Sequence, residues 1–83
     1  MIDKLFLKNI NDLKLRINDI TTNNINIDYV YFYNLLVIYN SLCHIETNLV
    51  NNALDVDNYQ YEVLANIASN IDQIENAIKG IIR

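Results

Sequence analysis

The amino-acid sequence predicts an all-α protein, a three-helix antiparallel bundle with an up-down-up order of helices. The 83 residues include one glycine and no proline, whereas the tight turns of β proteins usually use both. Apolar residues recur every three or four positions in the first and last parts of the chain, which is typical of helices with one buried face. The length predicts a single domain over residues 1–83, close to the lower limit for one hydrophobic core.

The first helix is predicted over about residues 2–21. Its apolar residues follow spacings of four and three and form one stripe: Ile2, Phe6, Ile10, Leu13, Ile17 and Ile20. The polar stretch Thr21-Thr22-Asn23-Asn24 follows it. Because asparagine tolerates the left-handed backbone conformation that ends many helices, we expect the first helix to stop there.

The second segment has two interpretations, because residues 26–40 read NIDYVYFYNLLVIYN. Tyr29, Tyr31 and Tyr33 alternate as in a strand, and aromatic residues favour strands. No other run in the chain can pair with such a strand, and its backbone groups would be left without partners. As a helix over about residues 27–53, the segment forms one apolar stripe: Tyr31, Leu35, Ile38, Leu42, Ile45, Leu49 and Ala53. We therefore predict a helix that starts near residues 26–29.

The third helix is predicted over about residues 58–82. Its apolar residues keep a regular alternation of three and four: Leu64, Ile67, Ile71, Ile74, Ile78 and Ile81. Asp57 is a suitable N-cap, and Gln60 is placed to complete a capping box. Short connections between the three helices make neighbours antiparallel.

Charge and composition restrict the partners and the compartment. Six Lys and Arg against ten Asp and Glu give a net charge of −4, and no lysine or arginine lies between Arg16 and Lys79. Direct nucleic-acid binding, which needs a basic track, is therefore not expected. The single cysteine, Cys43, cannot form an intramolecular disulfide, which favours a reducing compartment. No export signal is recognisable and residues 29–39 are too few to span a bilayer, so we expect a cytoplasmic protein without membrane contact.

The sequence offers no constellation for catalysis. Cys43 and His44 are adjacent, and adjacent residues on a helix point about 100° apart, so they cannot act as a nucleophile and base. Asp55-Val56-Asp57 resembles the start of a calcium loop only superficially, because Gln60 and Asn66 stand where such a loop needs glycine and glutamate. Neither a metal-ligand cluster nor a glycine-rich phosphate loop is present. We predict no enzymatic activity, no metal and no cofactor.

One short stretch is similar to a known family motif. Asn40-Ser41-Leu42 followed by Glu46, in an acidic chain of this length, resembles the Asp-Ser-Leu motif of acyl carrier proteins. The resemblance implies that Ser41 carries phosphopantetheine at the start of a helix that follows a long loop. This chain departs from the motif, since Asn40 replaces the aspartate and a helical apolar pattern runs through the residues before Ser41.

The predicted second helix has more apolar residues than one buried face requires. If Tyr31, Leu35, Ile38 and Leu42 face the bundle, another group projects to the opposite side: Tyr29, Val30, Tyr33 and Val37. Exposed apolar patches tend to mark interaction sites, and tyrosine is enriched in them. We predict that these four residues bind a protein, with homodimerisation through the second helix as the first choice and a foreign partner as the second. The alternative is that the bundle wraps around them.

These observations together predict a small, acidic, non-catalytic protein-binding module. We expect it to be an inhibitor or antagonist that covers a surface of another macromolecule, and that surface can be a basic one. The 15 asparagines and 14 isoleucines indicate AT-rich codons and suggest a phage or mobile-element origin, with action in the host cytoplasm. A bacteriocin-type immunity protein and a structural subunit of a larger assembly are the alternatives. An acyl-carrier-like protein with Ser41 as the attachment site is a more distant one.

Overall fold

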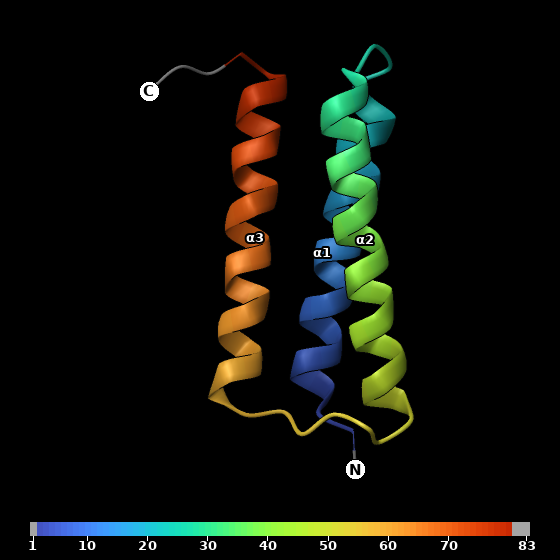
Figure 1. The fold of residues 1–83 in the computed structure, drawn as a ribbon, viewed down its shortest axis with the longest axis vertical. Helices are drawn as coiled ribbons and strands as arrows, with labels where there is room; N and C mark the ends of the chain where they lie inside the picture. Colours follow the sequence, from blue (N-terminus) through green and yellow to red (C-terminus); the bar gives the residue numbers. More distant parts are fainter. Residues whose placement is uncertain (1, 81–83) are drawn as a thin grey trace.

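The computed structural model describes residues 2–80, which form three α-helices: α1 (Lys4–Asn23), α2 (Tyr29–Val50) and α3 (Asn58–Ile78). In Figure 1, α1 runs upward, α2 returns downward and α3 runs upward again. All three pairs of helices are in contact. The described residues contain no strand. The predicted all-α up-down-up bundle is therefore confirmed, and residues 29–40 belong to a helix.

Each helix begins directly after an aspartate. The three carboxylates accept backbone N–H groups of the first turn: Asp3 from Phe6 at 3.0 Å, Asp28 from Val30 at 2.8 Å and Asp57 from Gln60 at 3.1 Å. Such caps satisfy N–H groups that have no partner within the helix, and the negative charge suits the positive end of the helix dipole. The predicted cap at Asp57 is confirmed. Because Asp3 is a cap, α1 begins two residues later than its apolar pattern predicts.

Helix α2 ends at Val50, three residues before the predicted position. Asn52 adopts a left-handed conformation with a φ of 57°. Its N–H donates to the carbonyl of Leu49 at 3.1 Å, and the N–H of Ala53 donates to the carbonyl of Asn48 at 2.8 Å. This pair of bonds is a Schellman motif, which satisfies the last carbonyls of a helix. Ala53 consequently lies outside the helix and is exposed, so its predicted place in the buried stripe is wrong.

The other two helix ends differ in their chemistry. Asn24 follows α1 with a φ of −126°, so the predicted left-handed conformation is wrong there. Its side-chain amide instead donates to the carbonyl of Ile20 at 2.7 Å, which caps the helix without a backbone reversal. Gly80 lies just after α3 with a φ of 72°, a conformation that favours glycine. The prediction that α3 continues through residues 79 and 80 is wrong, because the helix ends at Ile78; its predicted last residues, 81 and 82, lie outside the described residues.

The core lies between the three helices and consists of ten buried apolar residues: Phe6, Ile10, Leu13, Ile17 and Ile20 from α1, Leu35, Leu42 and Leu49 from α2, and Leu64 and Ile71 from α3. No polar or charged residue of the described chain is buried. Since α1 supplies half of the core, it is the helix against which the other two pack.

A second contact joins the beginnings of α1 and α3. The rings of Phe6 and Tyr61 meet edge to face, with centroids 5.3 Å apart and an interplanar angle of 82°. The hydroxyl of Tyr61 lies 3.1 and 3.0 Å from the two carboxylate oxygens of Asp3. The aspartate that caps α1 therefore also fixes the first turn of α3.

Candidate protein-binding surface

The orientation of α2 follows from a simple repeat. Leu35, Leu42 and Leu49 are spaced seven residues apart and are all buried. Seven residues are close to two turns of an α-helix, so the three leucines lie along one line that faces the core. Side chains on the other side of α2 must therefore point to solvent.

The four residues predicted to bind a partner all lie on that outer side. The exposed fraction is 74% for Tyr29, 60% for Val30, 52% for Tyr33 and 45% for Val37. The rings of Tyr29 and Tyr33 lie side by side, with centroids 6.1 Å apart and planes inclined by 32°. The bundle therefore does not cover these four side chains.

Three further apolar side chains of α2 that the sequence did not single out are exposed: Phe32 and Leu36 beside the four predicted residues, and Val50, which is 50% exposed, at the end of the helix. Phe32 is 41% exposed and Leu36 is 45% exposed. Phe32 follows Tyr29 by three residues and Leu36 follows Phe32 by four. Because residues three and four apart are neighbours on a helix, this spacing could have predicted that both lie beside the other exposed residues. We call these six residues the α2 patch: Tyr29, Val30, Phe32, Tyr33, Leu36 and Val37.

The patch occupies only the first half of the outer face of α2. The second half exposes polar side chains: Asn40, Ser41, His44, Thr47 and Asn48. The outer face of α3 is mostly polar, with Asn58, Glu62, Asn66, Ser69, Gln73 and Asn76 exposed, although Tyr59 at its start is 66% exposed. Leu5 and Leu15 of α1 are also exposed, but among the described residues only the first half of α2 exposes six large apolar side chains.

Shallow grooves flank the patch on both sides. Between α1 and α2, a groove is lined by Ile17, Asn18, Thr21, Phe32, Leu36 and Tyr39. Between α2 and α3, a second groove is lined by Asn34, Val37, Ile38, Asn70, Gln73 and Ile74. Phe32 and Leu36 border the first groove and Val37 borders the second. The apolar surface thus extends from one groove across the crest of α2 to the other, and neither groove is lined by a charged residue.

The charged residue within α2 is Glu46, and it is paired. Lys14 of α1 donates to its carboxylate at 2.9 Å, and the ammonium group of Lys14 also lies 5.4 Å from the centroid of the Tyr39 ring. The hydrogen bond to Glu46 raises the pKa of Lys14, against the opposing effect of burial. Glu46 therefore adds little net charge to the surface of α2.

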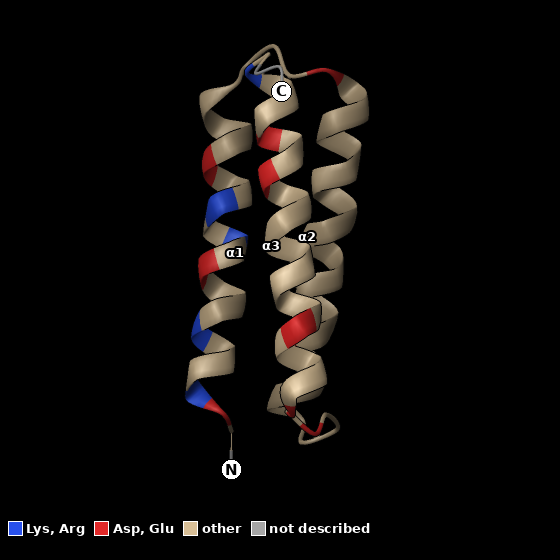
Figure 2. Ribbon diagram, turned by 90° about the vertical axis from the view of Figure 1, so that its left-hand side faces the viewer, with Lys and Arg blue, Asp and Glu red and all other residues tan. Residues whose placement is uncertain are grey.

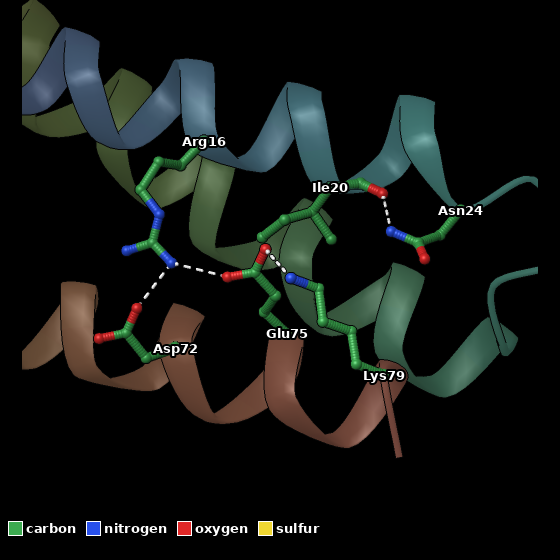
Figure 3. Close-up of polar contacts among 6 residues, drawn as sticks. All are labelled: Arg16, Ile20, Asn24, Asp72, Glu75 and Lys79. Atoms are coloured by element: carbon green, nitrogen blue, oxygen red, sulfur yellow. Dashed lines mark hydrogen bonds and ion pairs between the residues drawn. The ribbon is translucent and has the colours of Figure 1, made fainter. Parts of the chain in front are cut away.

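Most other charges of the helices lie on α1 and α3, as Figure 2 shows. One terminal nitrogen of Arg16 lies 2.6 Å from Asp72 and 3.2 Å from Glu75, and Lys79 pairs with Glu75 at 3.3 Å (Figure 3). This network spans the gap between α1 and α3. Asp28, the cap of α2, is the one charged residue between positions 20 and 45, so the α2 patch itself is uncharged.

The remaining candidate residues lie in the second half of α2, outside the patch: Ser41, Cys43 and His44. Ser41 sits in the middle of α2, where its hydroxyl donates to the carbonyl of Val37 at 3.1 Å. The long loop that the acyl-carrier resemblance implies before this serine is replaced by continuous helix. Cys43 is half-buried and His44 is exposed. Within residues 2–80, no group of three or more His, Cys, Asp or Glu side chains is placed to hold a metal ion.

None of the helices described in residues 2–80 has the length and hydrophobicity needed to cross a bilayer. Comparison of the chain with protein-family models, with curated proteins and with solved structures gives no match.

Proposed function

We propose that this chain is a small, non-catalytic protein-binding module whose binding surface is the α2 patch. The observation that carries the proposal is the exposure of six large apolar side chains on one half of α2, more than on any other part of the three described helices. Contiguous apolar surface is costly in water and commonly marks a protein contact. Tyrosine and phenylalanine, which make up half of the patch, are enriched in such contacts.

Within this class, we favour an inhibitor or antagonist, of the kind that phages and mobile elements encode in low-GC hosts. A protein with one binding surface can act by covering a surface of its target. An immunity protein or a structural subunit would use the same patch in a similar way. The α2 patch contains no charged side chain. Its composition therefore supports a partner whose contact surface is apolar rather than basic.

The experiment is a binding measurement with matched variants. The wild type, a double variant with Tyr33→Asp and Val37→Glu, and the control Asn66→Asp serve as baits for capture from host extract. Any protein retained by the wild type is then purified and titrated calorimetrically against all three. The control also introduces an acid on an exposed helix face, but on α3.

We expect the wild type and the control to bind equally and the double variant to bind at least about 30-fold more weakly, since a central interface tyrosine is commonly worth about 2 kcal/mol or more. Equal binding by all three proteins would overturn the α2 patch as the binding surface. Circular dichroism checks that the double variant keeps its helices, as the exposure of both positions predicts.

A further inference from the structure

We propose that the protein bound by the α2 patch is a second copy of this chain, held in an antiparallel contact whose two-fold axis passes near Tyr33. This inference rests on the proposed function, because it names the partner of the same surface. Three properties of the patch support it: its symmetry along α2, its area and its lack of charge.

The patch is symmetric about Tyr33. Its other main members lie four and three residues before Tyr33 and three and four residues after it: Tyr29, Val30, Leu36 and Val37. Asn40 closes the pattern seven positions after Tyr33, and on the other side α2 itself begins at Tyr29; Phe32, whose mirror position is Asn34, lies outside this symmetry. In an antiparallel pair of α2 helices centred on Tyr33, Tyr29 of one copy lies opposite Val37 of the other. A two-fold contact needs such a self-complementary surface: the two Tyr33 rings meet at the axis, and each Tyr29 faces a smaller valine.

The area of the patch suits a stable dimer. From the exposed fractions of its six residues, the patch exposes roughly 600 Å² per chain, about three quarters of the 800 Å² or so per partner in a standard interface. The flanking grooves add further surface to the contact. No additional segment of the chain is needed to complete an interface of ordinary size.

The distribution of charge permits two copies to meet at this face although each has a net charge of −4. The acids of α1 and α3 lie away from the outer face of α2, and Glu46 is paired with Lys14. Only Asp28 adjoins the patch. In the antiparallel register, the two Asp28 residues are about 15 Å apart along the helix axis, beyond the screening length of about 8–10 Å. A parallel pair would bring them together, which favours the antiparallel arrangement.

The test is sedimentation equilibrium over a concentration series, with charge variants at the proposed axis. The wild type should approach twice the chain mass of 9.7 kDa. Tyr33→Asp and Tyr33→Lys should each weaken association at least about 30-fold, because like charges meet at the axis. An equimolar mixture of the two should associate again, because opposite charges then face each other. Asn66→Asp and Asn66→Lys, on the outer face of α3, should dimerise like the wild type.

Each outcome separates the dimer from the broader proposal. A wild type that stays monomeric throughout overturns self-association and leaves the capture experiment to decide whether the patch binds another protein. A wild-type dimer that persists in both Tyr33 variants places the contact elsewhere and overturns self-association through the α2 patch, and the capture experiment again decides whether the patch binds another protein. If Tyr33→Asp and Tyr33→Lys are each monomeric and their equimolar mixture is also monomeric, the proposal that the two-fold axis passes near Tyr33 is overturned. If a Tyr33 variant loses its helices, Tyr29→Lys mixed with Val37→Glu tests the same register, because these positions face each other.

Discussion

Tyr61 of α3 donates a hydrogen bond to Asp3, with its hydroxyl oxygen 3.0 and 3.1 Å from the two carboxylate oxygens, while the same carboxylate caps α1. The hydrogen bond from the N–H of Phe6, and then that from Tyr61, lower the pKa of Asp3 below its ordinary value of 3.8, although burial opposes them. Burial and the hydrogen bond to Asp3 raise the pKa of Tyr61 above 10.0. One carboxylate thus joins two helices that are distant in the sequence.

This contact predicts a dependence of stability on acid pH. Because the pKa of Asp3 is lower in the folded chain, its contribution is fully present above the unfolded value of 3.8 and is lost as the pH falls through the folded value. The melting temperature of Asp3→Asn should therefore fall less steeply below about pH 4 than that of the wild type. Thermal melts by circular dichroism over an acid pH series measure this difference.

Two variants serve as checks on the acid titration. Asp19→Asn removes one exposed carboxylate from α1 and is the control for the loss of a single negative charge. Tyr61→Phe removes one hydrogen bond to Asp3 and should reduce the pH dependence in part. Parallel curves for the wild type and Asp3→Asn would show that this carboxylate does not stabilise the fold.

The Lys14–Glu46 pair should contribute more to stability than the Lys8–Asp12 pair. Their exposed side-chain fractions are 19% and 30% in the first pair, against 69% and 54% in the second. Exposed helical pairs contribute a few tenths of a kcal/mol, and the partly buried pair should reach about 1 kcal/mol. Double-mutant cycles by urea denaturation measure both couplings, with Lys→Met and acid→amide substitutions. Equal couplings would mean that burial of the first pair adds nothing.

The end of α2 offers a test of backbone conformation. Asn52 is exposed and has a φ of 57°. Because glycine adopts this conformation without strain, Asn52→Gly should leave stability unchanged or raise it slightly, whereas Asn52→Ala should cost about 1 kcal/mol. The corresponding shift in melting temperature is about 4–8 °C for a domain of this size. Asn51→Ala is the control, since Asn51 has a φ of −84°. A similar loss in both alanine variants would contradict the Schellman motif.

Two neighbouring leucines test which side of α2 faces the core. Leu35 is fully buried, whereas Leu36 is 45% exposed. Leu35→Ala should destabilise the chain by about 2–5 kcal/mol through lost packing and a residual cavity. Leu36→Ala, measured at a concentration where the chain is monomeric, should cost under about 1 kcal/mol. The two free energies of unfolding come from urea denaturation; equal losses would mean that α2 is rotated from the orientation described.

The sequence was sufficient to predict the three helices and the face of each helix that points to the core. All apolar residues of the α1 stripe from Phe6 to Ile20 are buried, because a period of three and four residues leaves one helical face to be covered. The surplus of apolar residues on α2 likewise predicted an exposed surface at Tyr29, Val30, Tyr33 and Val37. That these residues bind a protein stays a prediction.

Features that depend on side-chain chemistry at helix ends, or on helix packing, were not predictable from periodicity. Asn24 and Asn52 are both asparagines after a helix, yet one caps with its side chain and the other with a left-handed backbone. The ion pairs Lys14–Glu46 and Arg16–Asp72 join residues 32 and 56 positions apart. Such pairs require the rotation and register of each helix against its neighbour, which no local pattern contains.

The central place of α1 has a consequence for synthesis on the ribosome. Domains tend to fold from the N-terminus as the chain emerges. The α1–α2 hairpin, with Lys14 and Glu46, is complete before α3 leaves the exit tunnel. Until α3 has emerged, Arg16 and the apolar residues of α1 that α3 covers stay exposed to solvent. A chain that has released α2 but not yet α3 from the tunnel would expose two apolar surfaces, the outer patch and this open side of α1.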